Sequence, residues 1–286
     1  MIASSIAPPV MPAKLTLPRW APGFVKAAYW EMIEAVGYGL VGRHLNRFRK
    51  QRGLPPVWRV FHWWLSPQCI LACFPDWYGQ PQKDWAPQIK LTGFPMFDPH
   101  SDSELPEDLL NFISAGDPPI VFTFGTGMMH AAHLFAPAIE ACRQLKRRAI
   151  FVTRYADQLP EPLPAHIHHC LAAPFVKLFP KCAAVVHHGG VGTLSQAIAA
   201  GIPQLILPVA YDQLDNALRV KGLGAGNYLP RNRRSPIQIA EALTQLLRAP
   251  VQSRCRELAT MFTRPPGYET AADIVEEVAH AFRAKC

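Results

Sequence analysis

Several features are missing from this chain of 286 residues, and each absence excludes a class of protein. No apolar run reaches about 18 residues, the length that a membrane-spanning helix needs, so no such helix is expected. The N-terminus lacks the basic region and the clean apolar core of a secretory signal peptide, and we expect none. Disorder is not expected either, because 49% of the residues are hydrophobic and only 17% are charged.

Paired cysteines are also missing. The seven cysteines are scattered, and no two of them have the CxxC spacing of a zinc or redox site. An odd number of cysteines without a framework indicates reduced thiols. We therefore expect a cytoplasmic protein, and peripheral contact with the inner face of a membrane stays open.

Acidic residues are in the minority. The 29 Lys and Arg against 21 Asp and Glu give a formal net charge of +8, which suits nucleic acid, anionic lipid or small anions as partners. The basic residues are not interleaved with aromatic residues in the way of a single-strand binder, so nucleic acid is not expected.

A regular alternation of apolar runs and helical patterns is present from residue 120 onwards. The runs are short and show no in/out alternation, as in strands that are buried on both faces. They fall at residues 120–124, 149–152, 167–171, 183–187, 204–207 and 226–229. Because helical patterns lie between several of them, the sequence predicts an α/β fold with a doubly wound parallel sheet.

The most informative stretch is residues 183–220. A β-branched strand leads into a glycine turn with His188, and a helix is expected to open at Thr193. Such a turn offers free backbone N–H groups and the positive end of a helix dipole, which together form an anion site. Asp212 and Gln213 follow one strand later and suit the hydroxyl groups of a sugar. Phosphate at one end and sugar at the other indicate a nucleotide-sugar site.

This pattern resembles the donor-binding signature of the family 1 nucleotide-sugar glycosyltransferases, which have the GT-B fold and include bacterial macrolide, rhamnosyl and sterol glycosyltransferases. The matching residues are His188-Gly189-Gly190-Val191-Gly192-Thr193, Gly201-Ile202-Pro203, Pro208, Asp212-Gln213 and Asn216. The resemblance implies a Rossmann-like donor-binding domain over residues 98–286. Residues 1–97 resemble only the latter part of the acceptor-binding domain, so we expect its opening segment, which carries the family's catalytic histidine, to be missing.

The resemblance also implies the residues of the donor site. They are Gly125, Thr126, Phe175, His188, Gly190, Gly192, Thr193, Asp212 and Gln213. Structural alternatives stay open for some of them. The turn with Gly125 could be a tight strand–helix connection, and Asp212 could cap a helix. For the adjacent His187, a packed or capping role is the preferred interpretation.

Two residues depart from the family pattern. Ala172 stands where plant members have a base-stacking tryptophan, and Gln196 stands where they have a ribose-binding glutamate. These departures leave the choice between UDP and dTDP open.

Two kinds of catalytic group are not identified. No histidine lies in the context of the family's base, and His44 and His62 are interpreted as structural, so the catalytic residues stay unknown. The histidines at 166, 168 and 169 have no second ligand pair at zinc spacing, and the DxD motif of other glycosyltransferases is absent. We therefore expect neither a metal nor a cofactor beyond the donor itself.

The function implied by the resemblance is the inverting, metal-independent transfer of a hexose from a UDP- or dTDP-sugar to a lipophilic acceptor. The alternative is a catalytically impaired nucleotide-sugar-binding fragment or partner subunit. The basic residues at 43–52 and the aromatic residues at 58–85 could serve a lipid acceptor or an anionic membrane surface. Core packing beside a solvated basic face is the interpretation preferred for them.

Overall fold

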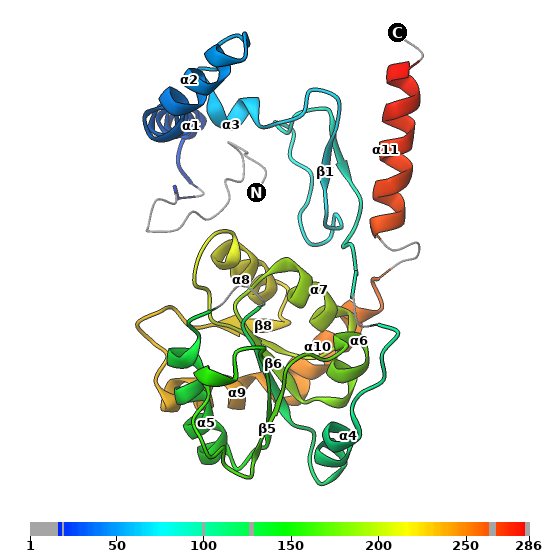
Figure 1. Ribbon diagram of the computed structural model, residues 1–286. Coiled ribbons are helices and arrows are strands. Elements are labelled where there is room, and N and C mark those ends of the chain that lie inside the picture. Colours follow the sequence, from blue (N-terminus) through cyan, green and yellow to red (C-terminus); the bar gives the residue numbers. More distant parts are fainter. Residues whose placement is uncertain (1–16, 19, 99–100, 126–128, 263–266, 284–286) are drawn as a thin grey trace. The chain divides into compact units, whose positions relative to one another are not determined.

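The computed structural model describes residues 17–18, 20–98, 101–125, 129–262 and 267–283 (Figure 1). They fall into two compact units. Unit 1 contains the described residues of Met1–Gly93 and of Gly267–Cys286, and unit 2 contains those of Phe94–Pro266.

Unit 2 is built on a six-stranded parallel sheet with the order β5-β4-β3-β6-β7-β8. The strands are β3 (Ile120–Thr123), β4 (Ala149–Val152), β5 (Ile167–Cys170), β6 (Ala184–His187), β7 (Gln204–Ile206) and β8 (Gly226–Tyr228). All six lie within the predicted apolar runs. The predicted α/β fold with a doubly wound parallel sheet is therefore confirmed.

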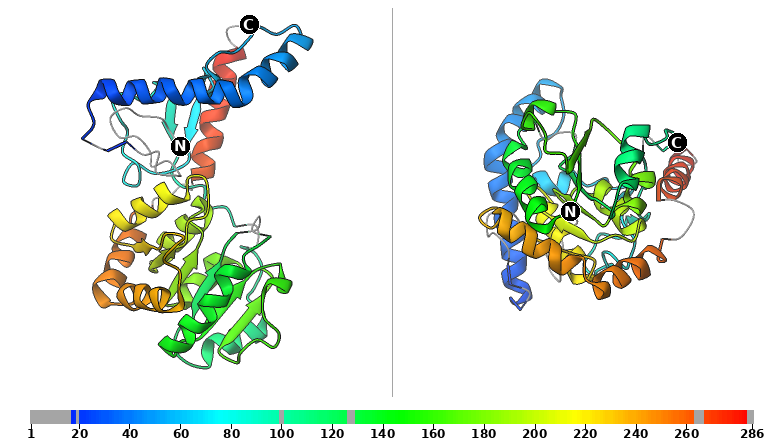
Figure 2. Two further views of the ribbon diagram at one scale, coloured as in Figure 1. Left: turned by 90° about the vertical axis from the view of Figure 1, so that its left-hand side faces the viewer. Right: turned by 90° about the horizontal axis from the view of Figure 1, so that it is seen from below.

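The two faces of this sheet carry separate hydrophobic clusters. Ile120 and Phe122 of β3 point into one cluster, which α5 (Ala132–Leu145) and α9 (Pro236–Leu246) cover. Val121 points into the other, which α4 (Glu107–Ser114), α6 (Phe175–Leu178) and α7 (Val191–Ala199) cover. Figure 2 shows α5 and α4 on opposite sides of the strands. Burial on both faces explains why the strand sequences lack in/out alternation.

Local sequence signals set the helix ends in unit 2. The side chains of Ser235 and Gln238 form a capping box at the start of α9, which also has a proline in its first turn. Helix α7 begins at Val191, two residues before the predicted Thr193, because Gly190 (φ −65°, ψ 138°) is its N-cap. The remaining helices are α8 (Gln213–Gly222) and α10 (Ala249–Ala259), with the short 3-10 segments η2 (Ala156–Gln158) and η3 (Phe179–Lys181).

The first elements of unit 1 form one continuous helical run. The run consists of α1 (Gly23–Gly37), a π-helical segment η1 (Tyr38–Gly42) and α2 (Arg43–Gln51). The rest of the unit is α3 (Val60–Trp63), the parallel strand pair β1 (Ile70–Ala72) and β2 (Ile89–Leu91), and α11 (Gly267–Arg283). No helix in the described parts of either unit has the length and apolarity to cross a bilayer.

Candidate functional site

A crevice of unit 2 lies where the strand order reverses. The chain leaves β3 toward β4 on one side and leaves β6 toward β7 on the other, so the loops after β3 and β6 diverge. A crevice forms at such a point, at the carboxyl ends of parallel strands, and it is where ligands bind in open α/β sheets. Here it is a cavity of about 740 Å³.

The cavity collects most of the residues that the sequence singled out. Its lining includes Gly125, Phe175, His188, Gly190, Gly192, Thr193 and Gln213. Asp212 is not part of the lining, although its neighbours Tyr211 and Gln213 are. Thr126 lies outside the described residues. Four separate loops therefore contribute to one cavity, although the residues are spread over about ninety positions of the sequence.

The imidazole of His188 lies against the backbone of both glycine turns. A Cβ atom on Gly190 would lie 2.5 Å from its Nε2, and one on Gly125 would lie 2.8 Å from its Cε1. Gly125 also has a φ of +83°, which favours glycine. A side chain at either position would displace the ring, so the two glycines create the space that His188 occupies.

The Nδ1 atom of His188 is buried, and no partner for it exists among the described residues. Burial lowers the pKa of the ring, while the nearby Asp212 carboxylate acts in the opposite direction. Buried polar atoms in folded proteins are almost always hydrogen-bonded, so this unpartnered nitrogen of a residue that lines the cavity is an exception.

His187, the neighbouring residue, is a structural member of the turn. The Gly189 N–H donates to its Nδ1 (3.1 Å), so the proton of the neutral ring is on Nε2, which donates to Gln204 Oε1 (2.9 Å). The side chain is fully buried, and burial lowers its pKa to about 3. The packed role predicted for His187 is confirmed, and its partner Gln204 on β7 was not foreseen.

Asn216 of α8 ties the glycine turn to the next loop. Its amide nitrogen donates to the Gly189 carbonyl (2.9 Å) and to Asp212 Oδ2 (2.9 Å). Gly189 itself has a φ of +98°, and a Cβ there would lie 3.0 Å from the Gln213 carbonyl oxygen. The turn and the start of α8 are therefore packed too closely for any residue but glycine at position 189.

Asp212 and Gln213 fix the loop that precedes α8. Gln213 Oε1 accepts from the backbone N–H groups of Val209 (2.7 Å) and Ala210 (2.9 Å). Asp212 occupies the N-cap position of α8, but its side chain makes no capping bond and instead binds Asn216. The capping alternative considered for Asp212 is therefore wrong. The Gln213 oxygen is occupied by the loop, so toward a ligand this side chain offers its NH₂ group.

The lining of the cavity also includes Phe175, Ala172 and Gln196. The ring of Phe175 stacks on that of Phe179, with centroids 4.5 Å apart and planes 12° apart. Gln196 Oε1 is a second buried acceptor without a partner among the described residues. The two residues that depart from the family pattern, Ala172 and Gln196, thus both line the cavity.

The sequence analysis missed Thr153 and Arg154, which also line the cavity. They directly follow β4, and residues that follow a parallel strand lie at the same edge of the sheet as the other loops. That rule, applied to the predicted run at 149–152, would have identified them. Arg154 adds an exposed positive charge to the lining.

The histidines at the β5 edge serve packing. His169 Nε2 lies 2.8 Å from the Thr153 carbonyl oxygen, and His168 lies against the Phe112 ring and 3.6 Å from Asp108. No group of three potential metal ligands occurs among the residues that the structure describes.

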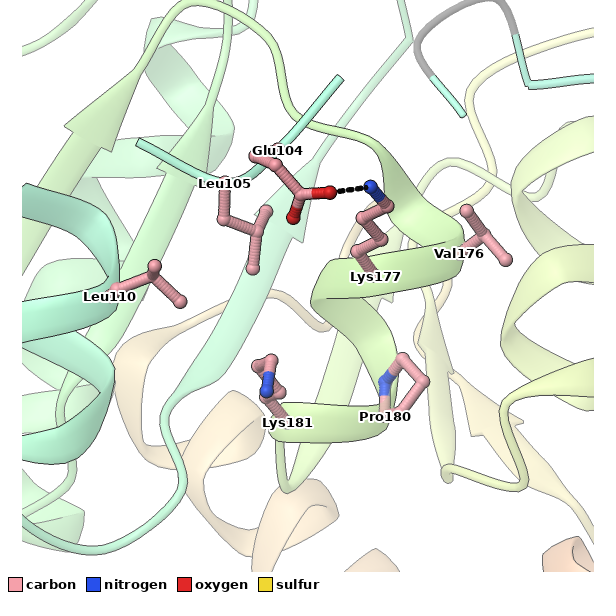
Figure 3. A pocket seen from close by; sticks show the side chains of 7 residues that line it. All are labelled: Glu104, Leu105, Leu110, Val176, Lys177, Pro180 and Lys181. Carbon is pink, nitrogen blue, oxygen red and sulfur yellow. Dashed lines mark hydrogen bonds and ion pairs between the residues drawn. The ribbon is translucent and has the colours of Figure 1, made fainter. Parts of the chain in front are cut away.

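A second, smaller cavity lies beside α6 and η3. Figure 3 shows its mostly apolar walls and the ion pair between Glu104 and Lys177 (2.5 Å). None of the residues predicted for the donor site lines it. It therefore contributes nothing to the site assembled above.

Comparison with known proteins agrees with this arrangement. Residues 149–277 match the family described as erythromycin biosynthesis protein CIII-like, C-terminal domain. The chain is 30% identical over 267 residues to O-mycaminosyltylonolide 6-deoxyallosyltransferase of Streptomyces fradiae. This match covers 90% of this chain and 61% of that protein. It is 26% identical over 258 residues to a sterol 3-beta-glucosyltransferase of Arabidopsis thaliana (86% of this chain, 42% of that protein).

The fold is also similar to that of the glycotransferase of kitacinnamycin. The TM-score is 0.67 at 19% identity, and the match covers 88% of this chain and 62% of that structure. The chain thus spans about three fifths of the length of the Streptomyces relative and of this structure.

Proposed function

Because this chain belongs to the nucleotide-sugar glycosyltransferase family with the GT-B fold, we propose that it binds a UDP- or dTDP-hexose in the cavity of unit 2. We propose further that the hexose is transferred with inversion, and without a metal, to a lipophilic acceptor. One observation carries the proposal: two glycine turns enclose His188, whose buried Nδ1 has no partner among the described residues.

The leaving diphosphate is assigned to the start of α7. The first backbone N–H groups of a helix have no intrahelical partner, and the helix dipole adds partial positive charge at the same end. His188 would supply a ring N–H and Thr193 a hydroxyl, while Thr126 would supply a second hydroxyl from the loop after β3. Stabilisation of the departing charge by these groups takes the place of a metal ion.

The lipophilic acceptor is inferred from the relatives. One of them is named for transfer to O-mycaminosyltylonolide and another for transfer to a sterol. A sterol is lipophilic, and the acceptor of this chain is proposed to be of that class.

The nucleotide site is tested with the variant His188→Ala. Removal of the imidazole is expected to weaken UDP or dTDP binding at least tenfold, about 1.4 kcal/mol, because one hydrogen bond to a charged oxygen is lost. Isothermal titration calorimetry measures this directly. His133→Ala, which removes an exposed histidine from α5, is the matched control and should bind as the original chain does. An unchanged affinity of His188→Ala would remove the basis for the site.

The sugar end is tested with Asp212→Ala. We propose that Asp212 and Gln213 form hydrogen bonds with the hydroxyl groups of the hexose. This variant should therefore lose affinity for the nucleotide-sugar and retain its affinity for the free nucleoside diphosphate. Asp212 also binds Asn216, which holds Gly189, so a purely structural role predicts equal losses for both ligands. Calorimetry with UDP and UDP-glucose, or with the dTDP pair, separates the two cases. Asp212→Asn, which keeps the shape, serves as the comparison.

A second candidate function is a nucleotide-sugar-binding chain that transfers poorly by itself. The observation that favours it is the described lining of the cavity, where His188 is the one imidazole and is assigned to the diphosphate. Such a chain would bind the donor normally and would act with a partner that supplies the acceptor base.

A further inference from the structure

We propose that residues 43–65 of unit 1, called here the basic aromatic segment, form a docking surface for an anionic lipid bilayer. The segment comprises α2, α3 and the loop between them. None of its residues is part of the lining of the unit 2 cavity, and the proposal can fail or succeed independently of the proposed function.

Most of the positive charge of the segment is not paired with a carboxylate. It contains five arginines and one lysine and has no aspartate or glutamate. Arg59 pairs with Glu31 of α1 (2.8 Å). For Arg43, Arg47, Arg49, Lys50 and Arg52, no carboxylate lies within 4.0 Å among the described residues. Arg49 is half-buried and its Nε donates to the Pro55 carbonyl (2.7 Å), whereas the other four cations are exposed and available to an anionic surface.

Large aromatic side chains are exposed in the same segment. Trp58 is 66% exposed, Trp64 is 59%, Phe48 is 54% and Trp63 is 44%. Single exposed apolar residues are ordinary, but a group of this size marks an interaction surface. Tryptophan is also the residue that most often sits at the level of lipid headgroups.

Cations and rings are in direct contact. The Arg49 guanidinium lies 5.0 Å from the ring centroid of Trp63, and that of Arg52 lies 5.2 Å from the ring of Phe48. Positive and apolar groups are therefore mixed over one patch. That combination favours the boundary between headgroups and acyl chains, where both kinds of group are satisfied.

The patch is fixed before any ligand arrives. The Asn46 side chain binds both the N–H and the carbonyl of Val57 (2.7 and 2.8 Å), which closes the loop onto α2. The Glu34 carboxylate of α1 accepts from the backbone N–H groups of Phe61 and His62, which holds the start of α3. Little conformational entropy has to be lost when such a surface binds.

The test uses the full chain and vesicles. We expect sedimentation with vesicles that contain phosphatidylglycerol, weak sedimentation with pure phosphatidylcholine, and loss of binding as salt rises. Removing two charges with Arg47→Gln and Lys50→Gln should weaken partitioning on the order of 25-fold, at about fivefold per basic residue. Trp58→Ser should also weaken it. The matched control removes two exposed charges of unit 2, Arg231→Gln and Arg233→Gln, and should bind normally.

Circular dichroism and nucleotide titration confirm that each variant is folded. Equal binding to neutral and anionic vesicles, or equal losses in the control variant, would overturn the proposal. A third result would also overturn it. If the chain does not bind vesicles but forms a dimer in analytical ultracentrifugation, and Trp58→Ser dissociates that dimer, the surface is a protein interface.

Discussion

Replacing His187 with leucine is expected to lower the free energy of unfolding by about 2–6 kcal/mol, because two buried groups lose their partners and each costs about 1–3 kcal/mol. The groups are the Gly189 N–H and Gln204 Oε1. Equilibrium urea unfolding of the chain at neutral pH measures the difference. A change below about 0.5 kcal/mol, the range of an ordinary surface substitution, would contradict the assigned bonds.

Two conservative variants separate the two hydrogen bonds of His187. Asparagine can place its oxygen where Nδ1 lies, so His187→Asn should keep the Gly189 contact and most of the nucleotide affinity. Glutamine can reach Gln204 with its NH₂ group, so His187→Gln should recover stability but leave the glycine turn loose. A larger loss of nucleotide affinity in His187→Gln than in His187→Asn would show that the ring acts through Gly189. The reverse order would contradict this.

The same histidine predicts how stability depends on pH. Its pKa in the folded chain is about 3, below the ordinary value of 6.5, so the unfolded chain binds the proton more readily. The stabilising contribution of neutral His187 is complete above pH 6.5 and is lost progressively as the pH falls toward 3. The stability difference between the original chain and His187→Leu should therefore shrink on acidification. A constant difference between pH 7.5 and pH 4.5 would argue against burial of the neutral ring.

The second large effect concerns turnover. We expect the purified chain to transfer hexose about 10²–10⁴-fold more slowly than a family member with an acceptor base, because general-base assistance typically contributes that much. Donor binding should be normal, and slow hydrolysis of the donor should be seen with or without a sterol acceptor. The measurement is product formation by mass spectrometry with UDP- and dTDP-hexoses. A segment that carries the base, supplied in trans from a longer relative, should accelerate transfer.

A rate on the order of 1 per second or faster from the chain alone would contradict this expectation. The base would then belong to this chain, and His44→Ala and His62→Ala would be the first variants to examine. Both histidines were interpreted as structural from the sequence, so loss of activity in one of them would correct that interpretation as well.

The sequence predicts the sheet of unit 2 closely because its four central strands, β4, β3, β6 and β7, are buried on both faces and are therefore mostly apolar. The loop predicted to bind the donor could also be recognised from the sequence, because Gly189, Gly190 and the histidine beside them form a local pattern. The hydrogen bonds that hold this loop could not be predicted from the sequence. Gln204 lies on another strand and Asn216 on a later helix, and nothing in their own neighbourhoods marks them as partners of the turn.

The start of α3 shows the same limit in unit 1. The apolar run at residues 60–65 gives no indication of a helix start, because the group that accepts its first N–H bonds is Glu34, 27 residues earlier. Likewise, the role of Asp212 could not be decided from its position before α8. Its carboxylate accepts a hydrogen bond from the Asn216 side chain one helical turn later, and this bond is known only from the structure.

The discontinuity of unit 1 has a consequence for biosynthesis. Unit 2 is contiguous in the chain, whereas unit 1 includes α11, which is made after all of unit 2. At about 5–20 residues per second, the roughly 190 residues that follow Gly93 take about 10–40 s to translate. During that time the tryptophans of α3 and the edges of the β1–β2 pair are present on a nascent chain whose unit 1 is incomplete. Unit 2 is therefore expected to fold first on the ribosome, and unit 1 is the part for which holding chaperones have the longest opportunity to act.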